Sequence, residues 1–315
     1  MTSTRNRLLN LTIAIGVASA RGAILERAGY GYLTSRLSGG YFFRFVSLLS
    51  IDTLVECGAN AAETSIHFIK NFNGQAIAIE ANPLTFQDRT SKSSLHGVIP
   101  ICVALSDSKG ITTLKVPTDG NLIFDGASSL SERNDDLDYK KYEIQQSTLD
   151  IVLEENLSKN FSHMALWVDV EGRALEVLKG AQATISSGQI ALIYVEVETF
   201  EFWEKQKLAP DVDDFLQKNN FTPVIRDMQS INQFNLLYVR DDLLAKCDEL
   251  VIDYWRELAN LKLGFWDKYR YRASAIKRKF MSNKNSMAAL SIHIISALFG
   301  SKSSRTEIFN KLKRK

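Results

Sequence analysis

Carboxylates stand at the ends of several short apolar segments in this sequence of 315 residues. Glu56 is followed closely by Gly58 and Asn60, and Glu80 ends the next apolar segment, 24 residues after Glu56. A carboxylate can accept hydrogen bonds from both hydroxyls of a ribose, and a glycine lets the backbone approach a ligand more closely than a residue with a Cβ does. The spacing is typical of a nucleotide-binding turn, whose ribose-binding acid lies about 20 residues beyond the glycine. An ordinary strand-to-helix turn with solvated acids is the alternative.

The turn after Glu56 suits a ligand that has no phosphate groups. A dinucleotide site would have the pattern G-x-G-x-x-G, which binds pyrophosphate at a helix N-terminus. Here the sequence from Gly58 to Glu63 is G-A-N-A-A-E, so two glycines are missing and Glu63 would place negative charge near a phosphate. S-Adenosylmethionine has a ribose, no phosphate and a cationic sulfonium, and it is the cofactor that we expect.

Two more pairs of carboxylates end later apolar segments and could do acid–base chemistry. Asp169 and Glu171 are two residues apart, as are Glu196 and Glu198, so in an extended chain the members of each pair point to the same side. Neighbouring carboxylates raise one another's pKa, and a carboxylate with a raised pKa can serve as a general base near neutral pH. We expect the base to be Asp169, followed in preference by Glu171 and Glu196. Capping of helices, or pairing with Arg173 and Lys179, is the alternative for each of them.

Metal and disulfide chemistry have weaker support in the sequence. Paired carboxylates could bind a divalent cation through their oxygens, but no third ligand is evident and we predict no metal site. Cys57, Cys102 and Cys247 form no Cys-x-x-Cys pair, so they indicate neither a zinc site nor a disulfide framework. Cysteines of this kind fit a reducing compartment, and we expect a cytoplasmic protein.

The elements that would position these carboxylates alternate in type along the chain. Short apolar segments with β-branched residues are separated by segments of helical periodicity, which indicates a mostly parallel sheet covered by helices on both faces. This is an α/β, Rossmann-like doubly wound fold. Its ligands bind beyond the carboxyl ends of the strands, where the carboxylates stand. The expected strands are 53–58, 76–81, 99–105, 163–170 and 190–198, and the expected helices are 61–72, 83–95 and 174–186.

The remaining segments complete the expected architecture. Residues 221–242 predict an antiparallel pair that closes the sheet. Residues 117–147 are polar and rich in turn formers, and we expect no regular structure in them; such long segments are usually functional or mobile. Residues 1–48 predict helices and loops with a break at Gly39-Gly40. The predicted domains are an N-terminal helical extension (1–48), a Rossmann-like domain (49–242) and a basic helical C-terminal extension (243–315).

Both ends of the chain have features that bear on membranes. Residues 1–20 have the outline of a signal peptide, with basic residues, an apolar stretch and Ala18-Ser19-Ala20, but a retained amphipathic helix is the favoured interpretation. Residues 259–315 contain 14 basic and 2 acidic residues, a net charge of +12 against −10 for the rest of the chain. Such a tail predicts peripheral contact with an anionic membrane surface or another polyanion, with a solvated helical lid as the alternative. No RNA-recognition motif accompanies the charge.

Five motifs, taken in order, resemble the FkbM family of S-adenosylmethionine-dependent methyltransferases. They are VECGANAAETS, AIAIEANP, VALSDSKG, STLD and WVDVEGRALEVLKGA, and the resemblance covers roughly residues 50–240. The resemblance implies methyl transfer from S-adenosylmethionine to an acceptor, which we expect to be a hydroxyl of a saccharide, a glycan or a related metabolite, lipid-linked or free. The alternatives are an inactive module of the same fold that binds a partner, and a methyltransferase that reaches RNA or protein through the basic tail.

The resemblance also implies roles for individual residues. Glu80 would bind the ribose, Ser128 and Ser129 match a serine pair near the substrate, and Asp169 and Glu171 belong to the D-V-E-G motif that faces the substrate. The other residues expected at the cofactor are Glu56, Gly58 and Asn60 at its methionine end, and Ala104 and Leu105 against its adenine.

Four positions depart from the family pattern. Glu56 stands where the family usually has Asp, Ala62 where it has Gly, Trp167 where it commonly has Lys, and Ala174 where it often has Glu. The last two departures bear on the substrate and the activity rather than on the cofactor.

Overall fold

The computed structural model describes residues 2–120, 122–134, 137–157 and 162–262. Residues up to Asn260 form one compact unit. Most of the basic tail, residues 263–315, lies outside the described residues, so the contacts expected of it stay predictions.

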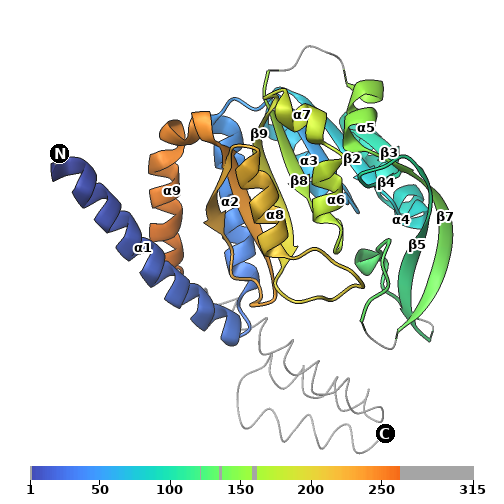
Figure 1. Ribbon diagram of the computed structural model, residues 1–315, viewed down its shortest axis with the longest axis horizontal. Coiled ribbons are helices and arrows are strands. Elements are labelled where there is room, and N and C mark those ends of the chain that lie inside the picture. The colour runs from blue at the N-terminus through green and yellow to red at the C-terminus, as the bar shows by residue number, and fades with distance from the viewer. Residues whose placement is uncertain (1, 121, 135–136, 158–161, 263–315) are drawn as a thin grey trace, which may run out of the picture. The chain divides into compact units, whose positions relative to one another are not determined.

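A seven-stranded sheet forms the centre of this unit (Figure 1). In spatial order its strands are β10 (Phe221–Arg226), β11 (Gln233–Arg240), β9 (Ile190–Glu198), β8 (Met164–Val168), β1 (Thr53–Cys57), β2 (Gln75–Glu80) and β3 (Ile99–Cys102). The last five strands of this order are parallel to one another, β11 is antiparallel to β9, and β10 is antiparallel to β11. The mostly parallel sheet and its closing antiparallel pair confirm the predicted fold class.

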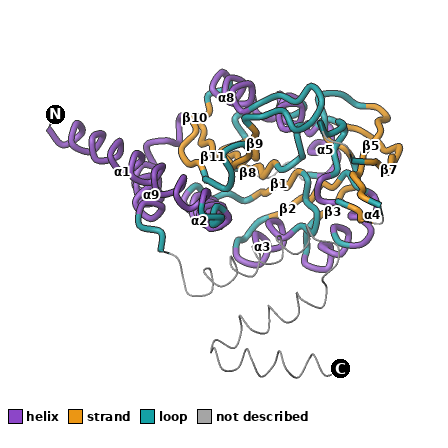
Figure 2. Tube along the Cα trace, turned by 90° about the horizontal axis from the view of Figure 1, so that it is seen from below, coloured by secondary structure: helices purple, strands orange, loops and turns teal. Residues whose placement is uncertain are grey.

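Helices cover both faces of this sheet (Figure 2). One face carries α2 (Tyr32–Leu48), α3 (Glu63–Asn71) and α4 (Pro83–Asp88), and α4 leads into the 3₁₀ helix η1 (Thr90–His96). The other face carries α5 (Leu149–Asn156), α6 (Ala174–Lys179), α7 (Gln182–Ser186) and α8 (Ala209–Lys218). Both faces of the central strands are therefore buried, which explains why their sequences are apolar without alternation.

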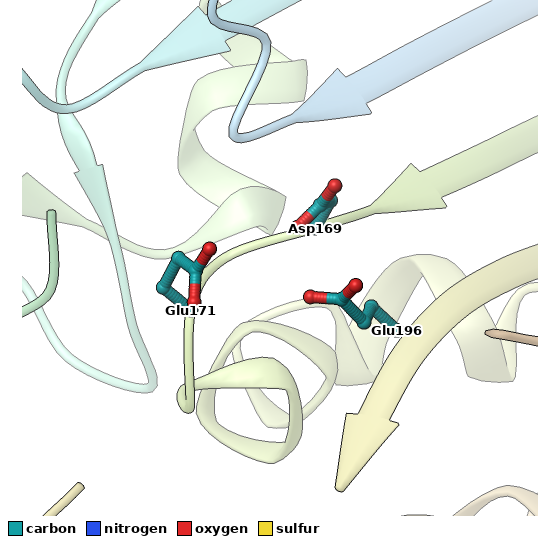
Figure 3. Close-up of side chains that lie close together, drawn as sticks. All are labelled: Asp169, Glu171 and Glu196. Atoms are coloured by element: carbon teal, nitrogen blue, oxygen red, sulfur yellow. The ribbon is translucent and has the colours of Figure 1, made fainter. Parts of the chain in front are cut away.

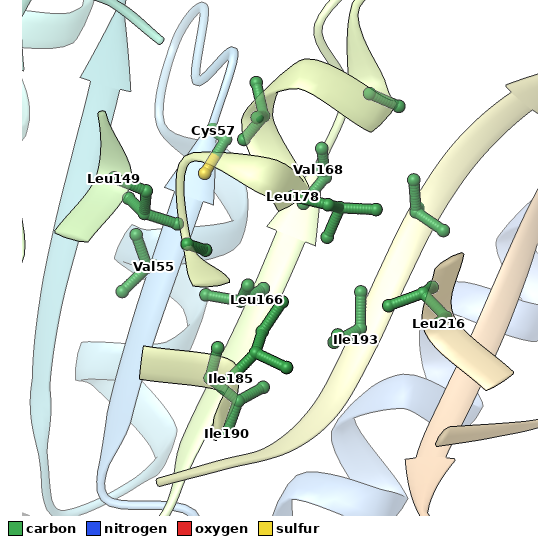
Figure 4. Packing of buried hydrophobic residues seen from close by; sticks show 14 of the residues in the cluster. Val55, Cys57, Leu149, Leu166, Val168, Leu178, Ile185, Ile190, Ile193 and Leu216 are labelled. Atoms are coloured by element: carbon green, nitrogen blue, oxygen red, sulfur yellow. The ribbon is translucent and has the colours of Figure 1, made fainter. Parts of the chain in front are cut away.

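Successive side chains of a strand point to opposite faces of the sheet, so the position of a residue in its strand decides which helices it contacts. Val55 of β1 and Leu166 of β8 are neighbours in register and join a buried cluster that includes Leu178 of α6 (Figure 4). Burial of each such side chain stabilises the fold by about 1.5–3 kcal/mol. Glu56 and Trp167, the next register pair, point to the opposite face.

A second, four-stranded sheet corrects two expectations from the sequence. Its strands are β4 (Ala104–Leu105), β7 (Asp138–Ser147), β5 (Gly110–Asp119) and β6 (Leu122–Ile123). Residues 99–105 are thus not one strand, because β3 belongs to the central sheet and β4 to the second. Residues 117–147 are also not without structure, since β7 pairs with β5 from Asp138 to Gln146. The hairpin was missed because nearly all of β7 is exposed or half-buried, which leaves a weak apolar pattern.

The predicted helix break at Gly39-Gly40 is wrong, because α2 runs through both glycines. Each glycine costs a helix interior about 1 kcal/mol relative to alanine. Burial of Tyr41, Phe42 and Phe45 against the rest of the unit offsets that cost.

Two further helices pack on one another beside the sheet. They are α1 (Thr2–Arg27) and α9 (Leu244–Ala259), and α9 also contacts α2 and β10 (Figure 1). Tyr254 and Trp255 of α9 donate hydrogen bonds to the carbonyls of Arg226 and Val224, at 2.7 and 3.1 Å. Among the described helices, none is both long enough and apolar enough to cross a membrane.

Candidate active site

The carboxyl ends of β1 and β8 meet where the order of the strands reverses. From β1 the chain adds β2 and β3 on one side, and then β8 and β9 on the other. Ligands of open α/β sheets bind in the crevice at such a point. One cavity lies here, and the predicted site residues that line it are Gly58, Asn60, Glu80, Ala104, Leu105, Ser128, Ser129, Asp169 and Glu171.

Glu80 is held at the tip of β2 by backbone amides. Its two carboxylate oxygens accept hydrogen bonds from the N–H groups of Asn60 (2.8 Å) and Asn82 (2.7 Å). Burial raises the pKa of this carboxyl, and these amide donors oppose the rise. Because a carboxylate offers about four acceptor positions, Glu80 can still accept a hydrogen bond from a ligand in the cavity.

Gly58 serves a contact within the protein. Its φ is +81°, and a Cβ on it would lie 1.8 Å from the carbonyl oxygen of Asp169. From the sequence we expected this glycine to admit a ligand; the backbone that comes so close is instead the start of the acidic turn after β8. The amide of Asp169 donates to the carbonyl of Cys57 at 2.9 Å, so the two strand tips are joined next to the glycine.

Glu56 does not line the cavity. It lies within β1, in register with Trp167, and its carboxylate accepts a hydrogen bond from the amide of Ser65 in α3 at 2.8 Å. Burial raises the pKa of Glu56 to about 7. The structure therefore gives Glu56 a contact with α3, and a direct role at the cofactor stays a prediction.

The two serines connect the cavity to its surroundings. The hydroxyl of Ser128 accepts a hydrogen bond from the side-chain amide of Asn82 at 3.1 Å, and that of Ser129 donates to the carbonyl of Glu171 at 2.8 Å. Ser128 therefore links the segment between β6 and β7 to Asn82, just after β2. Ser129 links the same segment to the turn that contains Glu171.

Arg89 and Asp125 also belong to this site, although we did not predict them from the sequence. The guanidinium of Arg89 lies 2.6 Å from a carboxylate oxygen of Asp125 and donates to the side-chain oxygen of Asn60 at 2.9 Å. Asp125 lines the cavity from η2 (Asp125–Ala127). The only sequence signal was the turn-rich composition around Asp125, because pairing with Arg89 depends on the fold of the second sheet.

Three carboxylates gather beside the cavity, near the carboxyl ends of β8 and β9. Oxygens of Asp169, Glu171 and Glu196 lie within 4.8 Å of one another (Figure 3). Asp169 and Glu171 follow the end of β8, and Glu196 reaches them from β9 (Figure 3). Glu171 was expected in an extended segment, but it lies in a turn with a φ of 34°. Glu196 itself is not among the residues that line the cavity.

The proton affinities in this carboxylate cluster are raised by burial and by mutual repulsion. Burial first, and then the charges of Asp169 and Glu198, raise the pKa of Glu171 to about 8. Burial and the charges of Asp169 and Glu171 raise the pKa of Glu196 to about 10. Burial also raises the pKa of Asp169, whereas its hydrogen bond with Glu196 lowers the pKa of Asp169 and raises that of Glu196, so Glu196 holds a proton more tightly than Asp169 does. Glu196 also accepts from the side-chain amide of Gln233 at 2.8 Å.

The same cluster provides a third carboxylate for a metal, which was not evident from the sequence. Three carboxylates are ligands of the type that Mg²⁺ and Ca²⁺ prefer. Acidic clusters occur without a cation, and among the described residues no other ligand type joins these three. The arrangement of the three carboxylates fits acid–base chemistry as well as it fits metal binding.

Trp167 and Ala174, the two departures on the substrate side, lie away from the cavity lining. The ring of Trp167 packs edge-on against Phe42 of α2 with centroids 5.1 Å apart. Ala174 is buried at the first position of α6. Next to it, Arg173 lines the cavity and pairs with Glu176 at 3.6 Å. Trp167 and Ala174 therefore do not form part of the cavity lining in this structure.

Comparison with protein families matches residues 56–223 to the Methyltransferase FkbM domain. The chain belongs to this family. Because the family consists of methyltransferases, the protein is an S-adenosylmethionine-dependent methyltransferase. A search of curated proteins found no match.

Solved structures with a related arrangement of elements are distant from this chain. One is magnesium protoporphyrin IX methyltransferase (ChlM) from Synechocystis PCC 6803 with bound SAM, with 12% identity and a TM-score of 0.35; the match covers 68% of this chain and 81% of that one. Another is TrmK of M. capricolum in complex with S-adenosyl-homocysteine, with 10% identity and a TM-score of 0.34; the match covers 64% and 68% of the two chains. These similarities are too weak to carry an argument about substrate.

Proposed function

We propose that this enzyme transfers a methyl group to a hydroxyl of a saccharide, a glycan or a related metabolite. The observation that supports the proposal is the shared cavity: Asp169 and Glu171 line the same space as Glu80 and Gly58. A carboxylate base and a nucleoside-binding acid that line one cavity fit methylation of a weakly acidic hydroxyl.

The residues of the cavity would divide the work as follows. Glu80 accepts hydrogen bonds from the ribose, Ala104 and Leu105 pack against the adenine, and the turn from Gly58 to Asn60 borders the methionine end. S-Adenosylmethionine, when bound, supplies the electrophilic methyl group and the leaving group.

The carboxylates would prepare the acceptor. Asp169 accepts the proton of the acceptor hydroxyl as the oxygen takes up the methyl group, with Glu171 as the second choice of base. Glu196 donates a hydrogen bond to Asp169 at neutral pH, and loss of that hydrogen bond would raise the basicity of Asp169. The protein thus aligns the hydroxyl and removes its proton, which contributes about 10²–10⁴ to the rate of comparable reactions.

Calorimetric titration tests the cofactor part of this proposal. S-Adenosylmethionine and S-adenosylhomocysteine would be titrated into the full-length protein and its Glu80→Ala variant. We expect micromolar binding by the wild type and a loss of at least tenfold in the variant. The matched control is Glu63→Ala, an exposed acid at the start of α3, which should bind normally. Failure of the wild type to bind either compound would contradict the proposal.

The basic residues of 259–315 support a second part of the proposal, peripheral contact with a membrane that presents a lipid-linked acceptor. The support is their net charge of +12, which attracts anionic lipid headgroups. Sedimentation with vesicles of phosphatidylglycerol should bring down the full-length protein at low salt. Equal sedimentation after deletion of residues 263–315 would contradict it.

A further inference from the structure

The loop between β9 and α8 carries three aromatic residues that are joined by two ring contacts. The rings of Phe200 and Phe202 meet edge to face with centroids 5.4 Å apart, and Phe202 meets Trp203 in the same way at 5.9 Å. Trp203 is 1% exposed, whereas Phe200 is 57% exposed. The loop therefore anchors one aromatic ring in the protein and presents another to solvent.

Hydrogen bonds hold this loop in place. The side-chain oxygen of Gln206 accepts from the amides of Phe202 (2.9 Å) and Trp203 (3.2 Å). The carbonyl of Phe202 accepts from the amide of Asn134 at 2.8 Å, which joins the loop to the segment before β7. Exposure of Phe200 is thus a fixed feature of the surface, and exposed apolar groups on a fixed surface often mark binding sites.

The loop borders the acidic turn directly. Gly172, the residue after Glu171, lies so close to the ring of Trp203 that a Cβ on it would approach the ring to 2.9 Å. The guanidinium of Arg133 lies 5.0 Å from the centroid of Trp203 and lowers the pKa of Glu171 through its charge. Phe200 also follows Glu198 by two residues, and Glu198 interacts electrostatically with Asp169. The exposed ring of Phe200 therefore lies on a loop whose Trp203 packs against Gly172, the residue that follows Glu171.

We propose that Phe200 and Phe202 form a platform for a sugar ring of the acceptor. A sugar ring has a face of C–H groups, which can stack on an aromatic ring, and an edge of hydroxyls, which carboxylates bind. Both kinds of partner lie on adjoining segments, since Trp203 of the aromatic loop packs against Gly172 of the turn that carries Glu171. In this proposal the platform holds the ring while a hydroxyl reaches Asp169 or Glu171. This inference rests on the proposed function and specifies the class of acceptor and the residues that select it.

Methyl transfer to simple glycosides tests the platform. The probes are the methyl glycosides of glucose, galactose, mannose, rhamnose and N-acetylglucosamine, with S-adenosylhomocysteine formation as the readout. We expect transfer to at least one of them, a KM for the sugar raised at least tenfold in Phe200→Ala, and little change in kcat or in binding of S-adenosylhomocysteine. Phe200→Trp should restore the KM. Ile111→Ala is the matched control, because Ile111 is 64% exposed on β5 of the second sheet.

Two other outcomes separate the possible errors. If the wild type methylates a glycoside and Phe200→Ala has the same KM, the platform is wrong and the proposed function stands. If the wild type binds S-adenosylhomocysteine but methylates no glycoside, the proposals of a saccharide acceptor and of the platform are both wrong.

Discussion

Trp167 stacks on Tyr194, with ring centroids 4.2 Å apart and ring planes 28° from parallel. The two residues are register partners on β8 and β9, and the hydroxyl of Tyr194 lies 2.7 Å from that of Ser38 in α2. The position at which the family commonly has a lysine therefore serves in this chain to pack α2 on the sheet.

This role predicts a change in stability without a change in cofactor binding. Trp167→Ala removes a ring that contacts both Tyr194 and Phe42, and we expect it to lower the free energy of unfolding by about 2–4 kcal/mol. Urea denaturation would measure the loss. Calorimetry at a temperature where the variant stays folded should show an unchanged Kd for S-adenosylhomocysteine, and a Kd raised tenfold would mean that Trp167 takes part in the site.

Gly58 gives a prediction of the opposite kind, in which stability and cofactor binding fail together. In Gly58→Ala the new Cβ would collide with the carbonyl of Asp169, and the φ of +81° disfavours alanine. We expect the free energy of unfolding to fall by about 3 kcal/mol or more and binding of S-adenosylhomocysteine to be lost.

Gly40→Ala is the control for that substitution. Gly40 lies within α2, and a Cβ on it would meet nothing within 4 Å beyond its own helix and its chain neighbours. The alanine should raise the free energy of unfolding by about 0.5–1 kcal/mol. Destabilisation by both substitutions to the same degree would contradict the role assigned to the contact with Asp169.

The sequence predicted the parts of the fold that bury apolar residues on a regular pattern. The strand ending at Glu80 and the strand ending before Asp169 are continuous apolar segments, and their ends are marked by acids, so the fold class and the meeting of these acids followed from parallel-sheet geometry. In contrast, β7 has exposed polar residues at most positions, and it forms because β5 pairs with it. Pairing of this kind depends on partners far away in the sequence and leaves no local signal.

The candidate site shows the same division. Glu80, Asp169 and Glu171 stand at strand ends and could be found from spacing. The link from Arg89 to Asp125 joins the end of α4 to η2, and the contact of Gly172 with Trp203 joins two loops. Such contacts follow from tertiary structure alone.

Glu56 predicts how stability depends on pH. Its pKa is raised by burial from 4.5 to about 7, so the folded state keeps a proton that the unfolded state releases. The stability associated with this proton is fully present below pH 4.5 and is lost as the pH rises through about 7. Over that range one such group lowers the free energy of unfolding by up to about 1.4 kcal/mol per pH unit.

Glu56→Gln should remove this dependence, because the amide has the shape of the protonated acid and can still accept from Ser65. Urea denaturation at pH 5, 6, 7 and 8 should show a flatter profile for the variant and a more stable variant at pH 7–8. Glu63→Gln changes an exposed residue of α3, the helix of Ser65, and its stability should depend on pH as that of the wild type does. A variant less stable than the wild type at pH 8 would contradict the assignment.

The carboxylate cluster predicts both the identity of the base and the pH dependence of the reaction. Loss of protons from Glu171 and Glu196 makes Asp169 more basic, so the rate should rise with pH as the cluster loses protons. The pKa of Glu171 is about 8 and that of Glu196 about 10, so kcat/KM, which reports the free enzyme, should still be rising at pH 8.

Asp169→Asn should lower kcat by about 10²–10⁴ at every pH. Glu171→Gln should retain more activity and lose the rise near pH 8, because the titrating neighbour of Asp169 is gone. If Glu171→Gln instead abolishes turnover while Asp169→Asn keeps it, Glu171 is the base and Asp169 positions it.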